Sequence, residues 1–269
     1  VRSRRQRQMC IRDSYNYDVI VSDTHSSCKG HFFIKKHCTV RKILDMYTFE
    51  WALVLDGDVA VVNYQRKLDE FVHNNASVIH GIRFHNNEIC AGIYLIRNDE
   101  YGKKYLDDWV YSGYTGFNYD NGALHYILLD KIATGVPGKE ECQHIGQQSR
   151  TLKEYDAFIK CFHKILSKSV CNEKIKIMEN TEETPSWICI DTDRPNGKWT
   201  NISFLQHAMK PPYQLRPAPK CSQAYFQGGT DEFYIPPNQY KQTLKEFWSK
   251  NARRDTGWDY DICANIDYT

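Results

Sequence analysis

The sequence predicts an α/β domain in which a mainly parallel sheet is flanked by helices. Short apolar runs, typical of buried strands, alternate with longer segments whose apolar residues recur every three or four positions. The clearest strand is WALVL at residues 51–55, and the clearest helix is ALHYILLDKI at residues 123–132. With 269 residues, 41% of them hydrophobic, the chain is long enough to bury one such core.

The predicted elements follow from these two periodicities, taken in order. Short apolar runs between polar or glycine-containing turns predict strands at residues 17–23, 51–55, 77–84, 88–97, 175–178, 187–190 and 202–205. Helical spacing of apolar residues predicts helices at residues 31–47, 65–75, 99–111, 123–132, 152–166 and 240–248. Beyond about residue 170 the pattern weakens, and repeated prolines indicate an irregular, loop-rich wrap.

The first 14 residues differ from the rest of the chain. RRQRQMCIRDS at residues 4–14 resembles a translated sequencing adapter, so residues 1–14 are interpreted as an artefact, with a genuine basic arm as the alternative. Without them Lys+Arg falls from 35 to 30 and Asp+Glu from 33 to 32, so the net charge changes from +2 to −2. The basic balance that would favour a nucleic-acid partner disappears. We expect the remaining chain to be truncated, with its first strand missing.

The cysteines favour an oxidising compartment. Ten cysteines, nine without Cys10, are scattered with no CxxC pair, which speaks against a zinc site and for several disulfides. Two glycosylation acceptors, at Asn75 and Asn201, agree with a glycoprotein of the secretory pathway.

Two carboxylates follow the clearest strand directly. Asp56 and Asp58, with Gly57 between them, come where the strand ends, and ligands bind at this edge of open α/β sheets. Two acids at this spacing repel each other unless a cation lies near them, and a hard divalent ion with oxygen ligands is the natural candidate. A pair of solvated acids at a strand end is the alternative.

Other polar residues could complete such a site. His207 also follows a short apolar run and could supply a nitrogen ligand to the metal, while Lys210 could neutralise a phosphate as a point charge. Asp120 and Asn121 lie at a glycine-flanked helix start, where we expect Asp120 to be the N-cap even if the loop also faces substrate.

Three blocks of sequence, in order, carry a family resemblance. WALVLDGDVAVVN at 51–63, CAGIYLIRN at 90–98 and DNGALHYIL at 120–128 resemble nucleotide-sugar glycosyltransferases of the GT-A fold, which has a Rossmann-like sheet. The chain is most similar to a nematode-abundant domain family of unassigned function, related to fungal galactosyl- and mannosyltransferases and plant xyloglucan xylosyltransferases. We expect a glycosyltransferase-like domain at residues 15–210 and a loop-rich extension with one helix at residues 211–269.

The resemblance implies a metal-dependent transferase. Asp56, Asp58 and His207 would bind Mn²⁺ (or Mg²⁺), which bridges the diphosphate of a nucleotide-sugar donor. Asp120 and Asn121 would lie near the anomeric carbon, and the sugar would pass to a glycan or protein acceptor with retention of configuration. The resemblance also implies a Golgi or other secretory-pathway lumen, and a type II membrane anchor upstream of this fragment.

The donor would contact a further set of residues, according to the same resemblance. These are Gly57, Cys90, Ala91, Gly92 and Lys210. Related enzymes often have Asn where this chain has Cys90, and this change removes a hydrogen-bond partner for the sugar. A catalytically silent, transferase-derived binding protein is therefore a second hypothesis.

A third hypothesis is a phosphatase of the haloacid dehalogenase type. Its buried strand also ends in DxD, so Asp56 would be the phosphorylated nucleophile and Asp58 the general acid. Such an enzyme needs a later acid pair after a strand. The adjacent pair at a suitable distance, Asp107-Asp108, lies inside a predicted helix, so this hypothesis ranks below the transferase.

Overall fold

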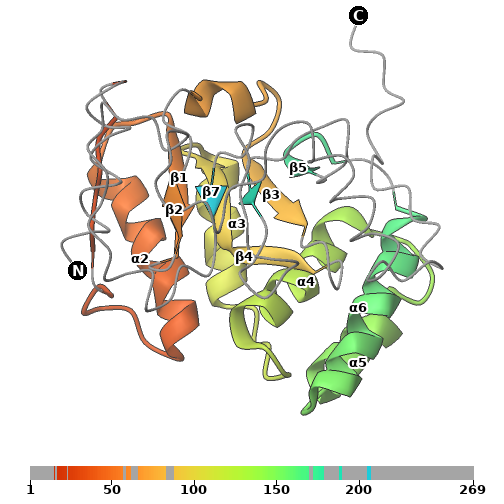
Figure 1. Ribbon diagram of the computed structural model, residues 1–269. Helices are drawn as coiled ribbons and strands as arrows, with labels where there is room; N and C mark the ends of the chain where they lie inside the picture. The colour runs from red at the N-terminus through yellow and green to blue at the C-terminus, as the bar shows by residue number, and fades with distance from the viewer. Residues whose placement is uncertain are drawn as a thin grey trace, which may run out of the picture. The chain divides into compact units, whose positions relative to one another are not determined.

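The computed structural model describes residues 15, 17–22, 24–56, 59–61, 66–82, 88–169, 172–178, 188–189 and 205–206 (Figure 1). The chain divides into two compact units. The described part of the larger unit is mainly residues 22–54 and 73–178, and the smaller unit includes residues 55–72 and the short strands that follow residue 179.

The larger unit contains a four-stranded mixed sheet. Its strands lie in the order β1 (Trp51–Leu55), β4 (Ile89–Arg97), β3 (Val78–Ile82) and β5 (Ile175–Met178). Strand β3 pairs antiparallel with β4 and parallel with β5. A parallel crossover needs a dozen or more residues, and the segment between β3 and β4 is too short for one. The predicted mainly parallel sheet is therefore not confirmed.

The helices of the larger unit largely follow the predicted periodicity. They are α2 (Phe32–Met46), α3 (Glu100–Val110), α4 (Tyr119–Ile132), α5 (Lys139–Gln148) and α6 (Leu152–Leu166). Four of them match predicted helices, and α6 matches to the residue. Helix α5 was not predicted, because it buries only Cys142 and Gly146 and so has little periodic apolar signal.

Two predicted elements are wrong over their described residues. Residues 17–22 form no strand, and Val19, Ile20 and Val21 there are exposed, so their apolar character reflects no burial. The predicted helix at residues 65–75 is reduced to one 3₁₀ turn, η1 (Leu68–Phe71), because only Phe71 of its expected apolar face is buried. The predicted helix at residues 240–248 lies outside the described residues.

The smaller unit contains a second, short sheet. Its order is β2 (Ala60–Val61), β7 (Leu205–Gln206) and β6 (Ile188–Cys189), with β2 antiparallel and β6 parallel to β7. Strand β6 lies within the predicted strand at 187–190, and β7 begins at the last residue of the one predicted at 202–205.

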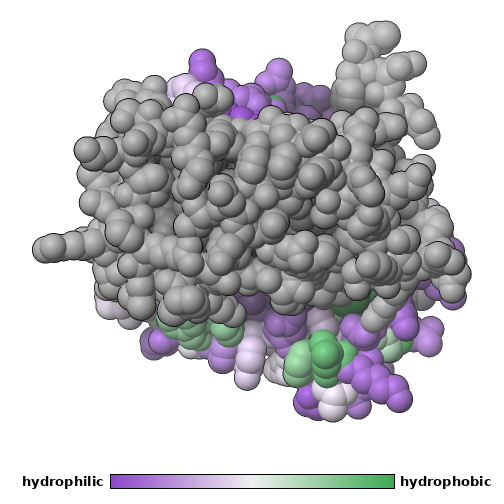
Figure 2. Space-filling model, in the orientation of Figure 1, coloured by the Kyte–Doolittle hydropathy of each residue, from purple (hydrophilic) through white to green (hydrophobic). Residues whose placement is uncertain are grey.

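The core of the larger unit lies around β4 and α4. Strand β4 is buried from Ile89 to Ile96, and α4 is buried around most of its circumference. A strand covered on both faces reads as a continuous apolar run, as in the sequence of β4. Along the lower edge of the view in Figure 2, where described residues are visible, small hydrophobic areas lie among hydrophilic side chains. No helix in the described part of the chain is long and apolar enough to span a membrane.

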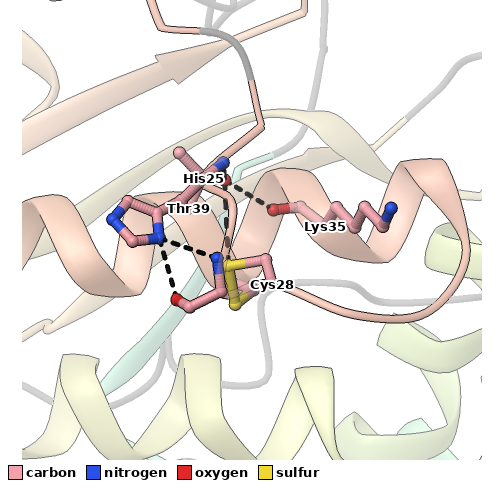
Figure 3. The surroundings of a disulfide bond; sticks show 6 residues. His25, Cys28, Lys35 and Thr39 are labelled. Atoms are coloured by element: carbon pink, nitrogen blue, oxygen red, sulfur yellow. Dashed lines mark hydrogen bonds between the residues drawn. A yellow bond between two sulfur atoms is a disulfide. The ribbon is translucent and has the colours of Figure 1, made fainter.

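Two disulfides confirm the prediction of disulfide bonding. Cys28–Cys38 ties the loop before α2 to that helix, and Cys142–Cys161 joins α5 to α6. In the loop, the backbone N–H of His25 donates a hydrogen bond of 2.8 Å to Thr39 Oγ1, so the segment is held against α2 (Figure 3). These crosslinks fit the oxidising compartment expected from the cysteine content.

Candidate functional site

The start of α4 contacts β4 through Asn121, which the family resemblance predicts to lie near substrate. Asn121 Oδ1 accepts a hydrogen bond of 2.7 Å from the backbone N–H of Ala91. Asp120 and Asn121 are both buried. The structure thus brings together residues from the second and third sequence blocks, which are about 30 positions apart in the chain.

Lys36 of α2 reaches the same place. Its ammonium donates to Asp120 Oδ2 and to the carbonyl oxygen of Ala91, each at 3.2 Å. The side chains of Lys36 and Asp120 are 19% and 10% exposed, so the ion pair is only partly open to solvent. Lys36 therefore connects α2, β4 and α4 at one point.

His37 lies beneath this ion pair and is fully buried. Its Nε2 is 3.5 Å from Asp120 Oδ2, its ring stacks on Trp109 at 3.6 Å, and its Nδ1 lies 3.0 Å from the Tyr94 hydroxyl. Burial and the nearby Lys36 charge lower the pKa of His37 to about 4, so the ring is neutral at pH 7.

The carboxyl group of Asp120 is ionised at neutral pH. Burial by itself would raise the pKa of Asp120, but the contact with His37 and the charge of Lys36 outweigh it and hold the pKa well below its usual range. The site thus presents one fixed carboxylate paired with one ammonium. Such a pair can accept hydrogen bonds from ligand hydroxyls and attract an anionic group.

Asp120 is not the N-cap, and that prediction is wrong. Helix α4 begins at Tyr119, Asn118 is the N-cap, and the Asn118 side chain does not cap the helix. Asp120 lies inside the first turn, where a carboxylate is favoured by the positive end of the helix dipole. The backbone of Asn118 and Tyr119 has φ values of 65° and 30°, in the left-handed region that non-glycine residues rarely adopt.

Glu88 holds this unusual helix start in place. Its Oε1 accepts hydrogen bonds from Asn118 Nδ2 at 2.5 Å and from the Tyr155 hydroxyl at 2.6 Å. Glu88 is 1% exposed, although it follows a polar turn in the sequence. Burial and the neighbouring Glu88 raise the pKa of Tyr155 well above its ordinary value, so the hydroxyl remains a donor.

His125 and Trp109 complete the support of the site. The backbone N–H of Ile89 donates to His125 Nε2 at 3.0 Å, so the ring proton is on Nδ1, which donates to the carbonyl oxygen of Asn121 at 2.7 Å. Trp109 Nε1 donates to the carbonyl oxygen of Asp120 at 3.0 Å. The backbone of both site residues is therefore fixed by buried side chains.

Of the other residues predicted to contact the nucleotide-sugar donor, some are described by the structure and some are not. Cys90 and Gly92 are buried in β4 on either side of Ala91, and Cys90 has a free thiol. Gly57 and Lys210 lie outside the described residues. Contact of these residues with a donor stays a prediction.

The predicted metal ligands are described only in part. Asp56 follows β1 directly and is half-buried, and its carbonyl oxygen accepts a 3.0 Å hydrogen bond from the Val59 N–H. Asp58 and His207 lie outside the described residues. A half-buried carboxylate suits a hard cation. Within the described residues no group of three or more His, Cys, Asp and Glu could hold a metal ion, so the predicted metal site stays a prediction.

Sequence reasoning missed the residues that position Asp120 and Asn121. These residues are Lys36, His37, Glu88, Asn118 and His125. The Asn121–His125 spacing on a helix was a weak signal, because i and i+4 share one face. Nothing in the sequence singles out the others, whose partners come from distant segments.

Comparisons with known proteins give a family and a few distant structural likenesses. A family model described as "Protein of unknown function, DUF273" matches residues 7–221. No curated protein matches the chain. A solved structure described as a glycosyltransferase involved in the glycosylation of the major capsid of PBCV-1 is 12% identical, with a TM-score of 0.45. The match covers 78% of this chain and 86% of that one. A likeness at this level is too low to assign an activity.

Proposed function

The chain belongs to the DUF273 family, since the family model matches most of its length, and we propose that it is a metal-dependent glycosyltransferase domain. It would transfer a sugar from a nucleotide-sugar donor to a glycan or protein acceptor, with retention of anomeric configuration. One observation carries the proposal: the three sequence blocks that resemble glycosyltransferases contain β1, β4 and α4, and β4 adjoins both β1 and α4.

The adjoining arrangement supports a shared site. Strand β1, which leads directly into Asp56, is the hydrogen-bonded neighbour of β4 in the sheet. Strand β4 in turn holds the start of α4 through the bond between Ala91 and Asn121. Segments of the larger unit that are far apart in sequence gain contact in this way, as expected if β4 and α4 contribute to one ligand site.

In this proposal each polar group has a defined task. Asp56, Asp58 and His207 would hold Mn²⁺ or Mg²⁺, which when bound stabilises the charge on the leaving diphosphate. Asp120, ionised and held by Lys36, would accept hydrogen bonds from the donor sugar and orient it near the acceptor. This is a positioning role, because Asp120 Oδ2 is already engaged by the ammonium at 3.2 Å.

The two disulfides also support a place for the enzyme in the cell. Disulfides persist in secretory compartments and are rare in the cytosol. We therefore propose the lumen of the Golgi or another secretory compartment.

The phosphatase hypothesis has less support. Asp107 and Asp108 lie in the last turn of α3 and are engaged in ion pairs, Asp107 with Arg41 at 3.1 Å and Asp108 with Lys131 at 2.6 Å. They follow no strand and so do not form the acid pair that this chemistry needs.

The proposal predicts that Asp58→Asn abolishes metal-dependent donor turnover. Hydrolysis of a panel of UDP- and GDP-sugars, with and without Mn²⁺, would fall more than about 100-fold, because one oxygen ligand to the ion loses its charge. The fold, followed by circular dichroism, should be retained. Asp18→Asn, which changes an exposed acid of the same unit, is the matched control. Undiminished turnover in Asp58→Asn would defeat the proposal, and Mn²⁺ binding without turnover of any donor would favour a silent binding protein.

A further inference from the structure

Four aromatic rings gather where α2 and α4 begin. We call them the aromatic patch: His31, Phe32, Phe33 and Tyr119. The rings of His31 and Tyr119 stack at 3.5 Å with an interplanar angle of 6°, and Phe33 lies within 6.3 Å of both. Phe32 is 69% exposed, Phe33 44% and Tyr119 51%, so the patch faces solvent.

The aromatic patch borders the Lys36–Asp120 ion pair. Tyr119 directly precedes Asp120, and Phe32 and Phe33 lie one helical turn before Lys36. The two helix starts are therefore joined twice, by the His31–Tyr119 stack and by the ion pair at 3.2 Å. Flat apolar surface thus lies beside a charged donor and a charged acceptor.

This arrangement matches the chemistry of a sugar ring. A pyranose has a face of C–H groups that packs on aromatic rings and a rim of hydroxyls that needs hydrogen-bond partners. The aromatic patch offers the first surface, and the Lys36 ammonium, whose side chain is 19% exposed, offers a hydrogen-bond donor for the second. Resting on the proposed function, we propose that the aromatic patch binds a sugar ring of the acceptor. The acceptor is then a carbohydrate.

The size of the patch agrees with a small ligand. Three half-exposed aromatic side chains present roughly 300 Å² of surface. A stable protein partner needs about 800 Å² on each side, more than twice that area. Tyr111, another exposed aromatic residue of the described part of the chain, is 78% exposed and lies at the C-terminal end of α3. The patch is thus large enough for one or two sugar rings.

Saturation-transfer NMR on the full chain tests the proposal. The probes are four disaccharides at millimolar concentration: lactose, cellobiose, mannobiose and chitobiose. At least one should receive saturation from aromatic protons, and its affinity should fall about 5-fold in Phe32→Leu and in Tyr119→Asn. Asn is chosen at position 119 because it tolerates the positive φ.

Two control variants separate stacking on the aromatic patch from the effects of apolar bulk and of losing any exposed ring. Phe32→Tyr keeps an aromatic face and should bind the same disaccharide normally, whereas Phe32→Leu keeps only apolar bulk. Tyr111→Asn removes a still more exposed ring elsewhere and should also bind normally. The inference is overturned if no disaccharide binds, if Phe32→Leu and Tyr119→Asn bind as well as the unaltered chain, or if sedimentation shows that the patch mediates self-association.

Failure of this inference can be told apart from failure of the proposed function. Hydrolysis of the nucleotide-sugar panel is measured on the same unaltered protein. Mn²⁺-dependent hydrolysis without disaccharide binding would overturn the aromatic patch as an acceptor site and leave the transferase proposal standing. Disaccharide binding without hydrolysis would support the patch as a saccharide surface and count against the transferase.

Discussion

Helices α4 and α6 begin in opposite ways. At α6, Thr151 Oγ1 accepts from the Glu154 N–H at 3.3 Å, and the Glu154 carboxylate accepts from the Thr151 N–H at 3.0 Å. This capping box is local and largely exposed. At α4, Asn118 has positive φ and no capping bond from its side chain, and the helix start is held by Glu88, 30 positions away.

This difference distinguishes a helix start that is stabilised locally from one that forms part of the candidate site. The start of α6 closes a helix with four consecutive residues and brings no distant polar group together. The start of α4 adopts a sparsely populated backbone conformation, which persists only where the surroundings over-determine it. Asp120, Asn121 and their partners lie at that point, so the strain coincides with the candidate site.

Removing Glu88 should disrupt the start of α4 and cause the largest loss in the free energy of unfolding. Glu88→Ala leaves the Asn118 amide and the Tyr155 hydroxyl without their buried acceptor, and we expect a loss of about 3 kcal/mol in the free energy of unfolding. Donor turnover should fall as well, because Asp120 loses its position. Urea unfolding followed by fluorescence measures the first effect. Glu88→Gln keeps an acceptor oxygen and should lose less than about 1 kcal/mol. Equal losses in the two variants would contradict this account.

Acidification should weaken the α4 start before the α6 start. The pKa of His37 is lowered to about 4 by burial and by Lys36, whereas an unfolded histidine titrates near about 6.5. The unfolded state therefore binds the proton first, so this contribution to stability is complete above about pH 6.5 and is lost as pH falls toward 4. We expect His37 to account for about 2 kcal/mol of the loss by about pH 4.5.

A histidine variant isolates this contribution. His37→Gln should show a shallower fall in unfolding free energy between about pH 6.5 and 4.5, measured by urea titration. His80, whose pKa is lowered to about 3 mainly by burial, is present in both proteins, so most of its contribution cancels in the comparison. Hydrogen bonds from the backbone N–H groups of Arg150 and Thr151 lower the pKa of Glu154 at α6, so that carboxylate stays ionised to lower pH than an ordinary glutamate. Identical pH slopes for the variant and the unaltered protein would rule out His37 as the cause.

Removing the N-cap of α6 should cause the smallest loss in the free energy of unfolding. Thr151→Ala deletes the acceptor for the Glu154 N–H and should lower the free energy of unfolding by about 1 kcal/mol, with Thr151→Ser close to the unaltered protein. Donor turnover should not change in either variant. A large loss of turnover in Thr151→Ala would show that α6 also shapes the site.

Much of the local structure was predictable. β1, β5 and α6 match the prediction to the residue, and α2 and β4 match within one residue at each end, because burial imposes a period on their sequences. The prediction failed where apolar residues are not buried, as at Val19 to Val21. It also failed where a helix buries few apolar residues, as in α5.

The candidate site was predictable only in its outline. The sequence block at residues 120–128 singled out Asp120 and Asn121, and the structure places them against Ala91 from the block before it. Lys36, His37 and Glu88 gave no signal, since each acts on a residue at least 30 positions away. The N-cap assignment of Asp120 failed because the preceding residues turn left-handed, a conformation stabilised by Glu88 rather than by neighbours in the chain.

The sequence by itself determined the α/β class, most helix and strand positions, the disulfide-bonded character and the blocks that carry the functional proposal. These depend on composition and on periodic burial, which neighbouring residues encode. Only the tertiary structure decided that β3 and β4 run antiparallel, that Lys36 and His37 flank Asp120, and that Glu88 holds the start of α4. The physical reason is that a buried charge or polar group must find its partners in space, and those partners come from segments that only folding brings together.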